Sequence, residues 1–187
     1  MQDTFYISIM PHYWPNHHCQ SEGGSRIPNM PGETEGDKNY GFEKFIVNKL
    51  HRDRYRLMYW RKDKFTERNY VVSGVAPDLI YEYRDQSKTI GFAVACVWRG
   101  CYVNGSVAWA RGRQIKSYYD FQFREGIDVF IMIGIGNIPS DPAELYIVPL
   151  NHIPLHKTSL HFDFLKQYKR SASDNMFSLN VGPMFIE

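Results

Sequence analysis

The sequence has few cysteines, no long apolar run and no large excess of one charge. Its three cysteines (Cys19, Cys96 and Cys101) are odd in number and show no CxxC spacing, which excludes a disulfide scaffold and favours a reducing compartment such as the cytoplasm. The longest apolar run, 129–136, is too short to cross a bilayer, so no membrane partner is expected. A chain of 187 residues with 43% hydrophobic and 22% charged residues suits one globular core.

The net charge of +2 is unevenly distributed along the chain. Residues 41–70 hold nine basic against four acidic residues, and residues 99–124 hold five against one. Two basic segments in an otherwise acidic chain favour an anionic partner on one face. The alternative is that both segments are ordinary solvated helix surfaces.

Three regions are expected. Residues 1–40 contain four prolines and four glycines and no sustained period, which predicts an irregular N-terminal arm. His12, His17, His18 and Cys19 lie close together there, but their spacing matches no standard zinc pattern. Residues 41–150 should form the core, and residues 151–187 a C-terminal extension packed on it, with one short helix near 160–168.

The core is predicted to contain both helices and strands. Apolar residues at helical spacing predict a first helix that begins near Tyr40, and Ser106 is expected to cap a second helix that runs to about Glu125 before Gly126. Strands are expected at 55–60, 79–83, 90–98, 128–135 and 144–150. The almost wholly apolar strand 128–135 suits parallel pairing, so residues 90–135 predict a strand–helix–strand crossover. The predicted fold class is α/β, a central mixed sheet flanked by helices.

Three motifs follow one another in the core: Pro77-Asp78, the strand FAVACVWRG (92–100), and RQIKSYYDFQ (113–122) with Gln114 and Tyr118. Together they resemble the PD-(D/E)xK superfamily, the restriction-endonuclease-like nucleases, in its QxxxY branch. The resemblance is strongest over residues 41–150. It implies a restriction-endonuclease-like core with the element order α-β-β-β-α-β-β.

The resemblance also implies a mechanism and a set of site residues. Such nucleases bind Mg²⁺, or Mn²⁺, between the aspartate after the proline and the acid of the (D/E)xK strand, and the ion generates hydroxide for phosphodiester hydrolysis. The lysine two residues later lies on the same face of the strand and helps to activate the water. Asp78 matches the first acid, and Glu43 matches a supporting glutamate on the first helix.

The sequence departs from this pattern at its centre. The acid position falls on Ala95 and the lysine position on Val97, on the strand face that also carries Gly91 and Ala93. Loss of one carboxylate weakens binding of a divalent ion, and loss of the lysine removes an electrostatic group. The hydrolytic chemistry of the family is therefore predicted to be weak or lost.

Displaced residues could rescue that chemistry. Glu82 has the same strand parity as Asp78, so the two carboxylates are the candidate metal ligands. Lys116, on the helix of Gln114, or Lys88, near the start of the strand 90–98, could replace the missing lysine. The alternative is that Glu82, Lys116 and Lys88 are exposed surface groups.

The second helix supplies the candidate nucleic-acid contacts. Gln114 and Tyr118 share one helix face; the resemblance places them at the mouth of the active site, whereas Ala110 and Phe121 on the same stripe favour ordinary packing. Basic residues around this groove would contact phosphates independently of any metal. They are Arg99, Arg111, Arg113 and Lys116.

These observations leave three functions open. The favoured one is a DNA-binding protein that retains a nuclease scaffold without its metal chemistry, with Asp78 and Glu43 as residual acids. The second is a working Mg²⁺-dependent endonuclease with displaced residues. The third is a non-catalytic protein-interaction module, and a homodimer stays open for each. Cys96 is expected to be a small core residue rather than a nucleophile.

Overall fold

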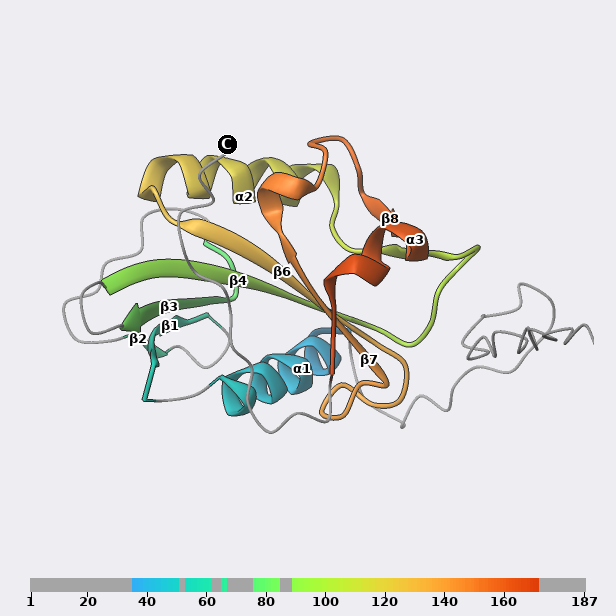
Figure 1. Ribbon diagram of the computed structural model, residues 1–187, viewed down its shortest axis with the longest axis horizontal. Helices are drawn as coiled ribbons and strands as arrows, with labels where there is room; N and C mark the ends of the chain where they lie inside the picture. The colour runs from blue at the N-terminus through green and yellow to red at the C-terminus, as the bar shows by residue number, and fades with distance from the viewer. Residues whose placement is uncertain (1–34, 51–52, 62–64, 67–75, 85–88, 172–187) are drawn as a thin grey trace, which may run out of the picture.

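The computed structural model describes residues 35–50, 53–61, 65–66, 76–84 and 89–171 (Figure 1). The histidines and Cys19 of the expected N-terminal arm, and Lys88, lie outside these residues. Helix α1 (Glu35–Lys49) begins five residues before Tyr40, inside the segment expected to be irregular. Among the described residues no helix is long and apolar enough to cross a membrane.

The centre of the fold is a seven-stranded mixed sheet with the order β2-β1-β3-β4-β6-β7-β9. Among the described strand pairs of this sheet only β4–β6 is parallel, as predicted for the crossover, and the others are antiparallel. Its strands are β1 (Tyr55–Trp60), β2 (Phe65–Thr66), β3 (Leu79–Arg84), β4 (Thr89–Arg99), β6 (Asp128–Ile135), β7 (Glu144–Pro149) and β9 (Lys169–Arg170). The expected α/β class is confirmed, and the predicted order of helices and strands is present with short strands added.

Helices cover both faces of the sheet. Figure 1 shows α1 on one side and α2 (Gly112–Glu125) on the other. Strand β4 separates the two layers, because its side chains alternate as predicted. Phe92, Val94, Cys96 and Trp98 pack in the core under α1. Ala93, Ala95 and Val97 pack in the core under α2.

The predicted start of the second helix is wrong. Ser106 caps no helix; it begins strand β5 (Ser106–Ala108), and α2 starts at Gly112. The cause is a long-range pairing of β5 with β8 (Ser159–His161), which local sequence patterns do not reveal. The C-terminal end of the helix is confirmed, because Gly126 adopts the left-handed conformation with φ of 65°.

The described part of the C-terminal extension, residues 151–171, packs on the core. After the 3₁₀ turn η1 (Leu150–His152) come β8, the short helix α3 (Phe162–Leu165) and a second 3₁₀ turn, η2 (Lys166–Tyr168). Ile153, Leu160 and Leu165 are buried in the core under α2. The extension therefore completes this layer and holds β5 in place.

A buried polar cluster lies near the far edge of the sheet. The Glu144 carboxylate accepts hydrogen bonds from the Tyr102 hydroxyl (2.7 Å), the Tyr146 hydroxyl (3.1 Å) and Lys169 Nζ (2.8 Å). Burial opposes ionisation of Glu144, but these partners, Lys169 first, lower its pKa. The cluster ties β7 to β9 and to the loop that follows β4, and no sequence motif pointed to it.

The cysteines differ from the sequence expectation in part. Cys96 is a free, buried thiol. Burial, and next the nearby charge of Asp78, raise its pKa well above the ordinary value, so the thiol stays neutral. This agrees with the packing role predicted for it. Cys101, in contrast, is disulfide-bonded, so the cysteines no longer argue for a reducing compartment.

Close contact between α1 and β6 predicts a strong response to a single methyl group. A Cβ added at Gly134 would lie 2.5 Å from Cε2 of the fully buried Phe42. We expect Gly134→Ala to lower the free energy of unfolding by about 2 kcal/mol, because the packed ring cannot move aside. Urea unfolding measures the change. Gly112→Ala is the control, since its Cβ would meet nothing within 4 Å; a loss as large there would refute the packing argument.

Candidate nucleic-acid interface

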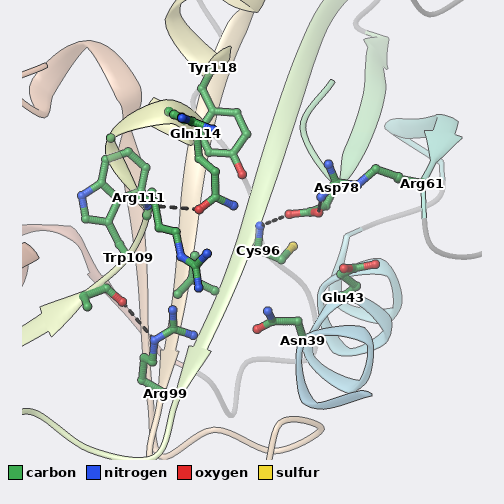
Figure 2. Close-up of a pocket in the computed structure, with 15 residues that line it drawn as sticks. Asn39, Glu43, Arg61, Asp78, Cys96, Arg99, Trp109, Arg111, Gln114 and Tyr118 are labelled. Atoms are coloured by element: carbon green, nitrogen blue, oxygen red, sulfur yellow. Dashed lines mark hydrogen bonds and ion pairs between the residues drawn. The ribbon is translucent and has the colours of Figure 1, made fainter. Parts of the chain in front are cut away.

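One cavity of about 1120 Å³ lies where β4 extends beyond β3, between α1 and the start of α2 (Figure 2). Four arginines and two carboxylates line it, so its formal charge is positive. The lining residues are Asn39, Glu43, Arg61, Asp78, Cys96, Val97, Arg99, Ala108, Trp109, Ala110, Arg111, Gly112, Arg113, Gln114 and Tyr118. The cavity thus brings together seven residues predicted from sequence: Glu43, Asp78, Arg99, Arg111, Arg113, Gln114 and Tyr118.

Asp78 lies at the point where β3 joins the sheet. Strand β3 pairs with β4 only as far as Val94, which places Asp78 beside Ala95, on the side of the sheet that Ala95 and Val97 share. The Asp78 Oδ2 accepts a hydrogen bond from the backbone N–H of Cys96 (2.8 Å). Its Oδ1 forms an ion pair with the Arg61 guanidinium. Both carboxylate oxygens are therefore engaged.

The free edge of β4 is closed by side chains rather than by a strand. Beyond Val94, the N–H of Cys96 is bound by Asp78, and the N–H of Trp98 donates to the Asn39 Oδ1 on α1 (3.4 Å). Polar side chains thus satisfy backbone groups that a neighbouring strand would otherwise bind. Asp78 has a structural role here in addition to lining the cavity.

Glu43 is also engaged. It is buried, 1% exposed, and its Oε2 accepts a hydrogen bond from the Trp60 indole N–H (2.7 Å). Trp60 ends β1, so this bond links α1 to the sheet directly below the cavity. Glu43 lines the same cavity as Asp78, and its buried, hydrogen-bonded carboxylate also joins the two layers.

The start of α2 forms the opposite wall. The Gln114 Oε1 accepts a hydrogen bond from the Arg111 backbone N–H (3.0 Å), which fixes the first turn of the helix. Just before it, the Trp109 indole donates to the carbonyl of Lys157 (2.7 Å), and its ring stacks on Tyr118. Gln114 and Tyr118 therefore both line the cavity. Tyr118 is buried against the core, whereas Gln114 is exposed and fixes the helix start.

The arginines of this wall differ in what they already bind. Arg99 donates to the carbonyls of Ala108 (3.0 Å) and Trp98 (2.8 Å), which ties the end of β4 to β5. Arg111 and Arg113 are exposed, and within the described chain their guanidinium groups have no hydrogen-bond or ion-pair partner. Two unpaired guanidinium groups on one wall are suited to binding phosphate.

Tyr118 points its hydroxyl into the cavity (Figure 2). The residue is 6% exposed, and no described residue accepts or donates a hydrogen bond at this oxygen. Burial, and next the charge of Asp78, raise the pKa of the hydroxyl. The group is thus a neutral donor rather than a base, which again suits an anion.

Two predicted residues lie elsewhere. Glu82 shares the side of the sheet of Asp78 but lies four residues along β3, about 13 Å away at strand spacing, and it pairs with Arg84 (3.4 Å). The two carboxylates are therefore not brought together for one metal ion. Lys116 is exposed, pairs with Asp120 (2.6 Å) and does not line the cavity. Neither Glu82 nor Lys116 lines the cavity.

Sequence reasoning missed Arg61, Asn39 and Trp109. Arg61 follows β1 directly, inside the basic segment 41–70, where nothing distinguishes it from its basic neighbours. Asn39 lies in the segment expected to be irregular. The packing of β1, β3 and α1 brings Arg61 and Asn39 to the cavity, and contacts with Lys157 and Tyr118 hold Trp109 there. No local signal marks these residues.

The donor set does not fit the magnesium ion that the resemblance implies. Mg²⁺ needs hard oxygen ligands in nearly octahedral geometry. Here Asp78 is bound through both oxygens, Glu43 is hydrogen-bonded to Trp60, and Ala95 supplies no oxygen from its side chain. Within the described residues no group of three or more histidine, cysteine, aspartate or glutamate side chains is placed to hold a metal.

Comparisons with protein-family models, with curated proteins and with solved structures found no match to this chain.

Proposed function

We propose that this chain is a nucleic-acid-binding protein, with DNA as the expected ligand, on a restriction-endonuclease-like scaffold whose metal-dependent hydrolysis is lost. The observation that carries the proposal is the wall formed by Arg111 and Arg113, both exposed and unpaired, beside the donor groups of Gln114 and Tyr118. Such a surface binds phosphate through charge and hydrogen bonds without reading base sequence.

The other side of the cavity supports the loss of hydrolysis. Hydrolysis in this superfamily needs a second carboxylate and a lysine on β4, and this chain has Ala95 and Val97 there, both in the core under α2. Tyr118 and Cys96 both have raised pKa values, so neither supplies a base or a nucleophile in their place. The site retains groups that bind phosphate and lacks groups that cleave it.

Retention of a short DNA duplex, measured by fluorescence anisotropy over a salt series, tests the proposal. We expect binding at low salt that weakens as salt rises. Replacing Arg111 and Arg113 together by glutamine should lower affinity about tenfold or more and reduce the log–log salt slope by about 2, since each phosphate contact contributes about 0.9. Arg124→Gln is the matched control, because Arg124 lies at the far end of α2 and pairs with Glu125.

The outcomes separate the three functions. No retention by the wild-type protein at low salt would contradict the proposal and favour a protein-interaction module. Plasmid nicking with Mg²⁺ or Mn²⁺ that Asp78→Asn abolishes would favour a working nuclease. Equal losses from Arg124→Gln and from the arginine pair would show that general surface charge, not the cavity, binds DNA.

A further inference from the structure

The carboxylate of Asp78 already has a cation bound to it. Arg61 Nη2 pairs with Asp78 Oδ1, and Arg61 Nη1 donates to the carbonyl of Ala76 (3.2 Å). The backbone N–H of Arg61 also donates to the carbonyl of Asp78 (3.0 Å). Three contacts with Ala76 and Asp78 therefore hold Arg61 against the segment that leads into β3.

The acidic groups and the tyrosine of the cavity affect the ionisation of Arg61. Burial alone would lower the pKa of the guanidinium, but Asp78, followed by Tyr118 and Glu43, raises it. The guanidinium lines the same cavity as the two carboxylates and the tyrosine, which come from α1, from the residue before β3 and from α2. Figure 2 shows Arg61 and Asp78 facing the cavity from the side opposite to Gln114 and Tyr118.

This arrangement explains why the carboxylates do not form a metal site. A guanidinium supplies positive charge and directed hydrogen bonds but no open coordination position. It stays charged at all ordinary pH values, and it needs no ion from solution. A site with such a cation can attract a phosphate, but it cannot activate a water molecule as a bound metal does.

We propose that the Arg61 guanidinium is the resident cation of this cavity, in the place of the divalent metal ion that a nuclease of this superfamily would hold beside Asp78. Metal binding at Asp78 is then blocked by an internal ion pair. One consequence of the inference rests on the proposed function, namely that DNA binding should not depend on Mg²⁺.

Titration with Mn²⁺, followed by electron paramagnetic resonance of the free ion, tests the blocking directly and needs no nucleic acid. The wild-type protein should have no Mn²⁺ site that depends on Asp78, so Asp78→Asn should leave its Mn²⁺ binding unchanged. Arg61→Met keeps the length of the side chain and removes the charge, so affinity for Mn²⁺ should rise about tenfold or more, and adding Asp78→Asn should abolish the gain. Arg84→Met is the matched control, because Arg84 pairs with Glu82 outside the cavity.

A second readout uses DNA retention in EDTA and in Mg²⁺. Wild-type retention should be equal in both, whereas folded Arg61→Met should bind more tightly in Mg²⁺ than in EDTA. Failure of the wild-type protein to bind DNA would refute the proposed function but leave the Mn²⁺ result to decide on Arg61. An Asp78-dependent Mn²⁺ site in the wild-type protein, or a folded Arg61→Met protein with no gain in Mn²⁺ affinity, would overturn the inference. If Arg61→Met does not fold, the wild-type titration decides alone.

Discussion

Replacing Asp78 by alanine is expected to lower the free energy of unfolding by about 2–3 kcal/mol. The change leaves the buried N–H of Cys96 without an acceptor and removes the anion that holds Arg61. Most of the loss should come from the buried amide, because Arg61 is 41% exposed and water screens part of its ion pair. Urea unfolding followed by tryptophan fluorescence measures the change.

The sign of this effect separates two roles for the same residue. An acid kept only for catalysis is commonly a burden on stability, so its removal is neutral or stabilising. Loss of an acid that closes the edge of β4 must instead lower the stability of the protein. Asp78→Asn should lose less than Asp78→Ala, since the amide oxygen can still accept from Cys96. Asp120→Ala is the control for an exposed ion pair and should cost no more than about 0.5 kcal/mol.

A gain in stability for Asp78→Ala would refute the structural role. It would also weaken the inference about Arg61, because loss of the Asp78 ion pair should lower stability rather than raise it. Measured together with Mn²⁺ binding, the stability change therefore shows whether Asp78 serves mainly as a ligand or as a structural group.

The sequence predicted the elements whose patterns are local. Strand β6 was predicted residue for residue at 128–135, and the alternating faces of β4 were predicted correctly, because a long apolar run and a period of two are written into neighbouring residues. The end of α2 at Gly126 also follows from a local rule. These elements position most of the predicted cavity residues.

The remaining features depend on contacts between distant segments. Ser106 is in a strand because β8 pairs with it more than fifty residues later. Asn39 reaches Trp98 across 59 positions, and Arg61 reaches Asp78 across 17. The same limit applies to Glu82, whose parity was right but whose distance along β3 excludes a shared ion. The alternation of residues along a strand predicts the face on which a side chain lies. A site also depends on the residues that other segments place opposite this side chain, and alternation does not predict them.

Introducing the (D/E)xK residues of the nuclease superfamily by Ala95→Glu with Val97→Lys is expected to destabilise the protein rather than to create a nuclease. Ala95 is fully buried under α2, so a carboxylate there should cost about 3 kcal/mol or more. Val97 lines the cavity, and a lysine at this position can extend its ammonium group into it at lower cost. The single variants, unfolded in urea, should show this difference.

The charge of the new carboxylate can be isolated with Ala95→Gln, which has the same shape. A larger loss for Ala95→Glu than for Ala95→Gln assigns the cost to the buried charge, and equal losses assign it to overpacking.

If the double variant folds, we expect the new carboxylate to pair with Arg61 rather than with a metal, because the guanidinium already lies beside Asp78. Adding Arg61→Met should then produce an Mn²⁺ site with a higher affinity than Arg61→Met gives alone. Mn²⁺ binding by the folded double variant with Arg61 intact would show that the ion pair does not block the site, and absence of Mn²⁺ binding in the folded triple variant would contradict the placement of Ala95 at the acid position of the nuclease motif.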